Sequence, residues 1–236
     1  DRVVTRKRGT LSITTNISDA DATLVKYCMN APNGTTATAD SSLAFLFSFK
    51  VAGTETFRIL RGCLPESASI NVSNTGFVEF TATFAVYSPA NEVTTSNGGL
   101  TSPTFATQST NTAWSHSDSG SNPFTWDSVA YPEMGFSIDI SYEHTVLESS
   151  GDLLIKWASI SQRNISASAS VFKKDSLLQI DTTAGNKVTA TRVLKTGTLT
   201  ATFTQAVIDT NPYSVSAESS ATIEELSFTA KELALA

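Results

Sequence analysis

Strict alternation of apolar and polar residues is the feature that most constrains how this chain folds. From residue 136 to residue 142, every even position is apolar or aromatic and every odd position is polar. The same period of two returns in residues 43–51, 76–87, 165–171 and 198–204, where Ser and Thr supply most of the polar positions. Successive side chains of a strand point to opposite sides of a sheet. Each segment therefore predicts a strand with one buried face and one hydroxyl-bearing face.

Shorter segments predict further strands, at residues 11–17, 57–60, 67–72, 153–160, 187–194 and 223–231. About ten strands joined by short turns are typical of a β-sandwich or a partly closed barrel. Helix is scarce: residues 18–29 predict one short helix with acidic residues in its first turn, and residues 174–180 predict a single turn. The predicted fold class is all-β, antiparallel, with one short flanking helix.

The alternation stops between residues 88 and 131, where Ser, Thr, Asn, Gly and Pro dominate. A structureless loop of about forty residues is uncommon inside a compact domain. Trp114, Phe124 and Trp126 argue against a simple linker, because large aromatic side chains need a surface to pack on. The segment either separates two half-domains or reaches a neighbouring subunit. We favour the second interpretation, an insertion in a single domain, residues 11–236, because the strands on either side fit one core. The three aromatic residues are its candidate contacts.

Charged residues make up only 16% of the chain, against roughly 25% in typical soluble domains. Burying a charge against another protein carries a larger desolvation penalty than burying a hydroxyl that finds a hydrogen-bond partner. A surface rich in Ser and Thr and poor in charge is therefore suited to being covered by a neighbour, and the composition favours self-assembly.

The net charge of −6 is unevenly distributed. Arg2, Arg6, Lys7 and Arg8 lie in a basic N-terminal arm, residues 1–10, so the body is more acidic than the total. Such an arm can grip a nucleic acid or a membrane, dock on an acidic neighbour, or remain solvated. We expect it to dock on an adjacent subunit. Specific DNA binding by the body is not expected, because its charge has the wrong sign.

The residues that usually carry chemistry are few and scattered. His116 lies among serines, but no nucleophile-elbow motif accompanies it, and His144 follows a strand as a surface residue would. Glu133 and Glu143 border a strand, where carboxylates are usually solvated and not a glycosidase pair. We predict that the chain is not an enzyme.

The remaining candidates for binding chemistry are equally sparse. Cys28 and Cys63 can pair or remain buried thiols, and with two histidines they give no metal-ligand spacing. We therefore expect no metal and no cofactor. No stretch is apolar enough to span a bilayer, and no signal peptide is visible, so a membrane partner is not expected.

The order of these segments resembles that of tail tube (major tail) proteins of tailed viruses. The first two matching elements are an apolar strand, residues 43–50, and a strand ending in Gly62-Cys63, residues 57–63. They are followed by a Ser-alternating strand (67–73), a tight turn (74–76) and a long strand with a hydroxyl face (77–84).

The second half of the chain is also similar. Residues 160–172 resemble the family's strand after an Arg-containing turn, residues 174–179 occupy the place of its short helix, and residues 226–231 resemble its last strand.

The resemblance implies a subunit that assembles with copies of itself into hexameric rings, which stack into a hollow tube. One sheet of each subunit would line the channel, and viral DNA would pass through without specific binding. Loops and the basic arm would lock successive rings. Other tail proteins would be further partners, and the subunit would assemble in the host cytoplasm and reside in the virion tail.

Two other classes of protein fit the same residues. An exported pilus or filament subunit that donates a strand to its neighbour would share the hydroxyl-rich strands. A carbohydrate-binding or adhesin module would need a planar aromatic platform, for which Trp114 and Trp126 are the available residues. We expect the tail tube subunit.

Overall fold

The computed structural model describes residues 9–30, 42–51, 54–94, 112–121, 123–147, 157–173, 177–215 and 222–236. These residues form antiparallel β-sheet with a few short helices, so the predicted all-β class is confirmed. The elements in chain order are β1 (Gly9–Asn16), α1 (Ala22–Asn30), β2 (Leu43–Val51), β3 (Thr54–Ser73), β4 (Val78–Thr94), the 3₁₀-helix η1 (His116–Ser119), β5 (Phe124–Trp126), β6 (Val129–Tyr131), β7 (Glu133–Leu147), β8 (Trp157–Phe172), α2 (Leu177–Ala184), β9 (Val188–Lys195), β10 (Leu199–Thr210), β11 (Tyr213–Val215), β12 (Thr222–Ala230) and β13 (Glu232–Leu235).

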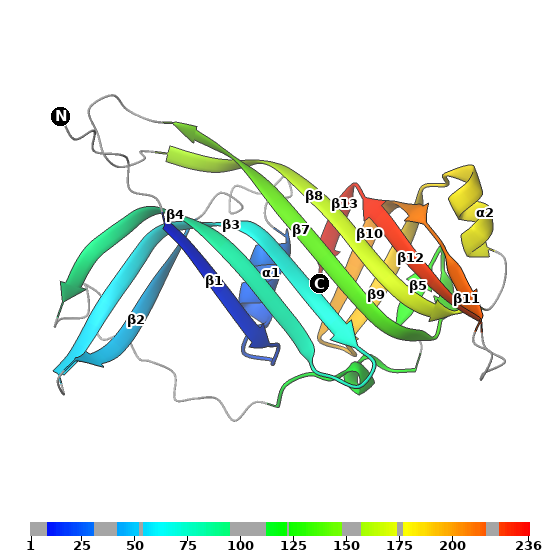
Figure 1. Cartoon of the computed structure of the whole chain (residues 1–236), viewed down its shortest axis with the longest axis horizontal. Coiled ribbons are helices and arrows are strands. Elements are labelled where there is room, and N and C mark those ends of the chain that lie inside the picture. The colour runs from blue at the N-terminus through cyan, green and yellow to red at the C-terminus, as the bar shows by residue number, and fades with distance from the viewer. Residues whose placement is uncertain are drawn as a thin grey trace.

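A long sheet forms the body of the molecule, with the strand order β1-β4-β3-β7-β8-β12 (Figure 1). β2 pairs with the first half of β3, and β11 pairs with β12. The register brings residues of the same kind side by side: Ile70 of β3 lies opposite Phe80 of β4 and Ile138 of β7. This matching of apolar with apolar positions gives the long sheet one continuous apolar face.

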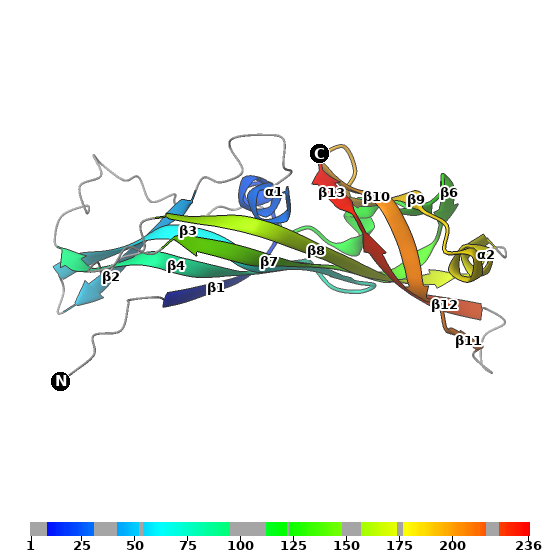
Figure 2. The ribbon, with the colours of Figure 1, turned by 90° about the horizontal axis from the view of Figure 1, so that it is seen from above.

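A second, smaller layer covers part of that apolar face. It contains β5, β6, β9, β13 and the first half of β10, and it lies on the same side of the long sheet as α1 (Figure 2). β10 belongs to both layers, since Ala201 pairs with β9 and β13 whereas Val207 pairs with β12. The pairing shifts around Gln205, whose positive φ of 53° bends the strand from one layer to the other.

The core lies between the two layers. Phe228 of β12 is fully buried, with its ring centroid 5.2 Å from that of Phe203 and 5.3 Å from that of Trp126. Phe124 and Phe136 join the same cluster of rings. Large aromatic side chains fill the space between the layers here, whereas Ala167 and Ala169 on the facing strand β8 leave room for them.

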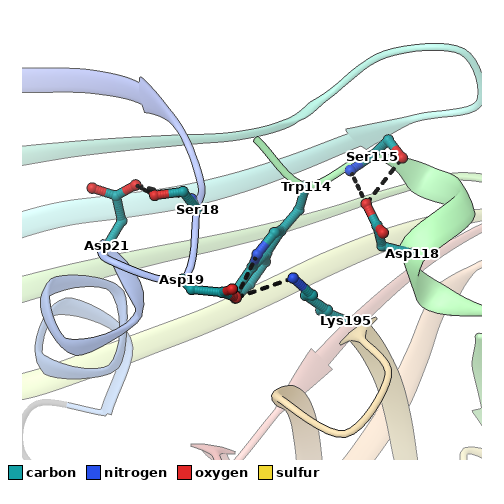
Figure 3. Close-up of polar contacts among 7 residues, drawn as sticks. All are labelled: Ser18, Asp19, Asp21, Trp114, Ser115, Asp118 and Lys195. Carbon is teal, nitrogen blue, oxygen red and sulfur yellow. Dashed lines mark hydrogen bonds and ion pairs between the residues drawn. The ribbon is translucent and has the colours of Figure 1, made fainter. Parts of the chain in front are cut away.

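Helix α1 begins and ends at residues whose polar groups are satisfied by neighbours. At its start, the Asp21 carboxylate accepts hydrogen bonds from the backbone and hydroxyl of Ser18, at 2.9 and 2.7 Å (Figure 3). At its end, Arg163 of β8 donates to the backbone oxygen of Met29, at 3.2 Å. A cation near the last carbonyl groups also favours the helix dipole. Because α1 begins at Ala22, the acidic residues precede its first turn and do not lie in it.

The end of α1 is also tied to β13. The Asn30 side chain donates to the backbone oxygen of Leu235 at 3.1 Å and accepts from the backbone nitrogen of the same residue at 2.7 Å. Arg163 completes the connection by donating to the backbone oxygen of Leu233, at 3.3 Å. Residues more than 200 positions apart in sequence are thereby fixed to each other.

Several elements differ from their predicted bounds. The strands predicted at residues 57–60 and 67–72 are two parts of β3, which continues through Gly62 because glycine adopts the positive φ of 65° found there. Likewise β8 runs unbroken through residues 157–172. α2 begins at Leu177, later than expected, and residues 174–176 lie outside the described chain.

The predicted insertion at residues 88–131 differs most. β4 continues to Thr94, and η1, β5 and β6 all lie within the second part of the segment, where β5 pairs with β9. Residues 95–111 lie outside the described chain. The described part of the segment is therefore not a single loop: residues 88–94 extend β4 of the long sheet, and β5 and β6 belong to the second layer.

Candidate functional site

The uncovered face of the long sheet is the most distinctive surface among the described residues. In Figure 2 the second layer and α1 lie on one side of the long sheet, and no described element lies on the other. We call the uncovered side the hydroxyl face. Its residues alternate with those of the core along each strand and are Ser12 and Thr14 on β1, Ser67, Ser69 and Asn71 on β3, Glu79, Thr81 and Thr83 on β4, Ser137, Asp139, Ser141 and Glu143 on β7, Asn164, Ser166, Ser168 and Ser170 on β8, Asp209 on β10, and Glu225, Ser227 and Thr229 on β12.

Hydroxyl groups on this face bond to each other across neighbouring strands. The side-chain oxygens of Thr14 and Thr81 are 3.1 Å apart, and those of Ser137 and Ser168 are 2.8 Å apart. Cross-strand hydroxyl pairs contribute only a few tenths of a kcal/mol up to about 1 kcal/mol each. They occupy polar groups that water would otherwise satisfy.

The charged members of the hydroxyl face are all carboxylates: Glu79, Asp139, Glu143, Asp209 and Glu225. A hollow of about 350 Å³ lies on this face, lined in part by Ser69, Asp139 and Ser166. None of the residues named above is a Lys or Arg, the side chains that usually contact phosphates.

An open sheet edge borders the hydroxyl face. β1 is eight residues long and pairs only with β4 among the described strands, so its other edge is available. Proteins usually protect such edges with Lys, Pro, a bulge or a very short strand. β1 contains neither Lys nor Pro, and its pairing with β4 shows no register shift from Gly9 to Asn16. This edge can accept another strand.

The two layers are fastened to each other by residues 112–119, which we call the clasp. Toward the long sheet, the backbone nitrogen of Trp114 donates to the oxygen of Ile17, and that of Val78 donates to the oxygen of Trp114, both at 2.8 Å. Toward the second layer, the backbone nitrogen of Thr196 donates to the oxygen of Asp118 at 3.0 Å. The clasp therefore joins the layers at a place distant in sequence from the β10 crossover.

Side chains reinforce the clasp (Figure 3). The Trp114 indole donates to Asp19 at 3.0 Å, and Lys195 binds the same carboxylate oxygen at 3.1 Å while lying over the indole ring. The hydrogen bonds from Lys195 and then from Trp114 lower the pKa of Asp19. Asp118 accepts from the backbone nitrogen of Ser115 at 2.7 Å, which starts η1.

A buried charge cluster lies behind the clasp. The Arg192 guanidinium of β9 is 2.5 Å from the Glu133 carboxylate of β7, and both side chains are fully buried. His116 of η1, with 18% of its side chain exposed, places Nε2 3.6 Å from the same carboxylate. Arg192 also donates to the backbone oxygen of Val193 and lies over the ring of Phe136. The cluster ties η1, β7 and β9 together.

Burial controls protonation in this cluster. It raises the pKa of Glu133, although the positive charge of Arg192 acts in the opposite direction. It lowers the pKa of His116, and the positive charge of Arg192 lowers it further. Glu133 is already neutralised by Arg192, so the carboxylate does little to favour a second cation on His116.

The aromatic residues predicted to contact a neighbouring subunit are located in the core of the chain itself. Trp114 is 1% exposed, and Phe124 and Trp126 are fully buried. The Trp126 indole donates to the buried Asp181 of α2 at 2.7 Å. These side chains therefore present no surface to a neighbour in this structure, and the expectation is corrected: their contacts are intramolecular. This also leaves no exposed platform from Trp114 and Trp126 for a sugar.

The predicted basic contacts cannot be placed in the same way. Arg2, Arg6, Lys7 and Arg8 lie outside the described residues, which begin at Gly9. Their role stays a prediction.

The other residues that often carry chemistry are not brought together. Glu133 faces the core whereas Glu143 lies on the hydroxyl face, on opposite sides of β7, so the two carboxylates do not face each other. Cys28 and Cys63 are free, buried thiols, whose pKa values burial raises to about 12 and about 11. The described residues contain no group of three or more His, Cys, Asp or Glu side chains arranged to hold a metal ion.

Sequence reasoning missed the buried charges, although a signal for them was present. Arg192 stands between Ala190 and Leu194, at a position where the alternation of β9 requires a core residue. Arg163 likewise occupies a core position two residues before Ile165. A charge at a core position of a strand implies a buried partner, because an unpaired buried charge is strongly disfavoured.

No protein-family model matches this chain, and a search of curated proteins also gave no match. Among the described helices, none has the length and apolar character needed to cross a membrane.

Proposed function

We propose that this chain is a structural subunit of a viral tail tube, which assembles with copies of itself into stacked rings around a channel for DNA. The observation that carries the proposal is the hydroxyl face, a wide uncovered sheet surface whose charged members are all carboxylates, next to the open edge of β1. The segment order that resembles tail tube proteins supports the same function. The ring is expected to be hexameric.

The chemistry of the hydroxyl face suits a channel lining. A surface that conducts DNA must not bind it, because each phosphate contact with Lys or Arg adds affinity. Asp139 and Glu225 repel phosphates, and the hydroxyls of residues such as Ser168 are occupied by their neighbours. In the proposed tube this face points to the channel, and the subunit acts by assembly and passive conduction with no bond chemistry.

The open edge of β1 provides a route to ring closure. Edge strands pair with other chains through backbone hydrogen bonds, which require no particular side chains. A neighbour that pairs along β1 continues the hydroxyl face from one subunit to the next. The basic arm enters the body at Gly9, the first residue of β1, so Arg2, Arg6, Lys7 and Arg8 lie close in sequence to this edge and are proposed to dock on the adjacent subunit.

Electron microscopy of the purified chain tests the proposal, with two matched variants. Ser12→Lys places a charge on the edge strand β1, and Ser168→Lys places the same charge on the central strand β8 of the same face. We expect hollow tubes of stacked rings from the unmodified chain. Ser12→Lys is expected to abolish rings, because a charge on an edge strand opposes pairing. Ser168→Lys is expected to leave the rings intact.

The second variant also tests the channel assignment. Tubes assembled from Ser168→Lys should retain added DNA at low salt and release it as salt rises, whereas unmodified tubes should not retain DNA. If Ser168→Lys tubes retain no more DNA than unmodified tubes, the hydroxyl face does not line the channel.

Deletion of residues 1–8 tests the arm. The truncated chain should fold normally but fail to form long tubes. Full-length tubes from it would show that the arm is dispensable.

Other outcomes would identify the competing classes of protein. Thin solid fibres, with a signal peptide in the unprocessed gene, would indicate a filament subunit that polymerises by strand donation. Dispersed monomers that bind a glycan array would indicate a carbohydrate-binding module. Either result would overturn the tail tube proposal.

A further inference from the structure

The clasp has a second property, which concerns how firmly it holds the two layers together at different pH. Its backbone bonds to the long sheet and to the second layer are made on either side of His116, which is the first residue of η1. The His116 ring lies against the Arg192–Glu133 pair. A change in the charge of the ring therefore acts between the two sets of backbone bonds that the clasp makes.

We propose that the clasp is an acid-sensitive fastener, in which a proton on His116 loosens the attachment of residues 112–119 to the two layers. This inference goes beyond the proposed function and does not depend on it.

The argument begins with the charges around His116. Arg192 and Glu133 form a close pair with no net charge, and neutral His116 adds none. A proton on His116 gives the cluster a net positive charge in a place that is largely closed to water. The protonated imidazole then lacks hydration and is repelled by Arg192, and both effects make the packed position of η1 less stable. Movement of η1 toward water relieves both.

The other charged groups on elements packed around η1 do not offset this repulsion. Asp118, on η1 itself, is engaged by the backbone nitrogen and hydroxyl of Ser115. Asp19, in the connection before α1, is engaged by Trp114 and Lys195. Lys195, at the end of β9, is a further cation. No carboxylate among these groups is left to pair with a protonated His116.

The direction of the pH effect follows from the two shifted groups. The pKa of His116 is lowered in the folded chain, so its contribution to stability is complete above the unfolded value of 6.5 and is lost as the pH falls below that value. The pKa of Glu133 is raised, so protonation of this group on acidification acts on stability in the opposite direction. The loosening is therefore expected in a window that begins just below pH 6.5.

Hydrogen exchange measured by mass spectrometry tests this inference on the full-length subunit. Peptides that include residues 112–119, the Val78 amide and the Thr196 amide report on the clasp, and peptides from β7 and β8 report on the body. After correction for the intrinsic pH dependence of exchange, protection in the clasp should fall by about threefold or more between about pH 7.5 and pH 5.5. Protection in the body should change less.

Two histidine variants provide a matched comparison, because the chain contains only two histidines. His116→Gln should remove the pH response of the clasp. His144→Gln should keep it, since His144 lies away from the clasp, where Nδ1 is 2.6 Å from the Tyr87 hydroxyl and Nε2 is 2.8 Å from the backbone oxygen of Pro65.

NMR titration of the unmodified chain keeps the inference testable even if a variant fails to fold. Two imidazole Cε1–H signals are expected. The His116 signal is identified by its loss in His116→Gln, or by its contacts with the other residues of η1. This signal should titrate below pH 6.5. Equal clasp protection at both pH values, a pH response that survives His116→Gln, or titration of His116 above 6.5 would each overturn the proposal.

Discussion

On β8, Ala167, Ala169 and Val171 are buried, whereas Ser166 and Ser168, which alternate with them along the strand, are exposed on the other side of the sheet. The same division runs across five neighbouring strands, since the register pairs apolar with apolar and hydroxyl with hydroxyl. The core face meets aromatic side chains of a second layer, and the hydroxyl face meets no described element. Buried apolar contacts are therefore concentrated on one side of the long sheet, and packing places little constraint on the residues of the hydroxyl face.

The largest expected effect is a cavity on the core face. Phe228→Ala removes a ring packed against four other aromatic rings and should lower the free energy of unfolding by about 3–5 kcal/mol. Its sequence neighbour on the hydroxyl face, Ser227, should tolerate Ala within about 0.5 kcal/mol. Urea unfolding of both variants measures the difference. Comparable losses would show that the hydroxyl face also carries stability.

Two carboxylates on β7 test the same difference between the faces for charged side chains. Glu133→Ala leaves Arg192 buried without its carboxylate partner and should cost about 3–5 kcal/mol. Glu143→Ala, ten residues along the same strand and on the hydroxyl face, should change stability by less than about 0.5 kcal/mol. Thermal unfolding at pH 7 gives both values; a large loss from Glu143→Ala would contradict the division.

The smallest expected effect concerns whether the serines of the hydroxyl face contribute to the stability of the fold. Ser168→Val should leave the free energy of unfolding unchanged or raise it by up to about 0.5 kcal/mol, because valine favours strands more than serine does. The substitution also removes the hydrogen bond with Ser137, so the measured change in the free energy of unfolding includes the loss of that bond. Guanidinium unfolding would refute the expectation if Ser168→Val were destabilised by more than about 1 kcal/mol.

The division between the two faces could be predicted from the sequence, because a period of two in β4, β7, β8 and β12 follows directly from strand geometry. The hydroxyl face could be predicted for the same reason. What alternation does not specify is which side faces a partner. The open edge of β1 also needed the structure, since strand order depends on pairing between segments far apart in sequence.

The second layer was only partly predictable. β5 and β6 have three residues each, too few to show a period, and they are joined by Asp127 and Ser128, both with positive φ, where Asn-Gly is the usual signal. The sequence therefore predicts a loop at Trp126, which the structure places in β5. Its partner Asp181 is 55 residues away, and no local pattern links the two.

The connection between α1 and β13 has a consequence for the order in which the molecule is completed. Asn30 belongs to α1, which is synthesised before every strand from β2 to β13, yet its hydrogen-bond partner is the backbone of Leu235. Arg163 likewise holds Met29 and Leu233 together. During translation α1 therefore lacks these contacts until the chain has been synthesised through Leu235. A nascent chain that lacks β13 cannot form these contacts, so this part of the core is completed only after β13 has been synthesised.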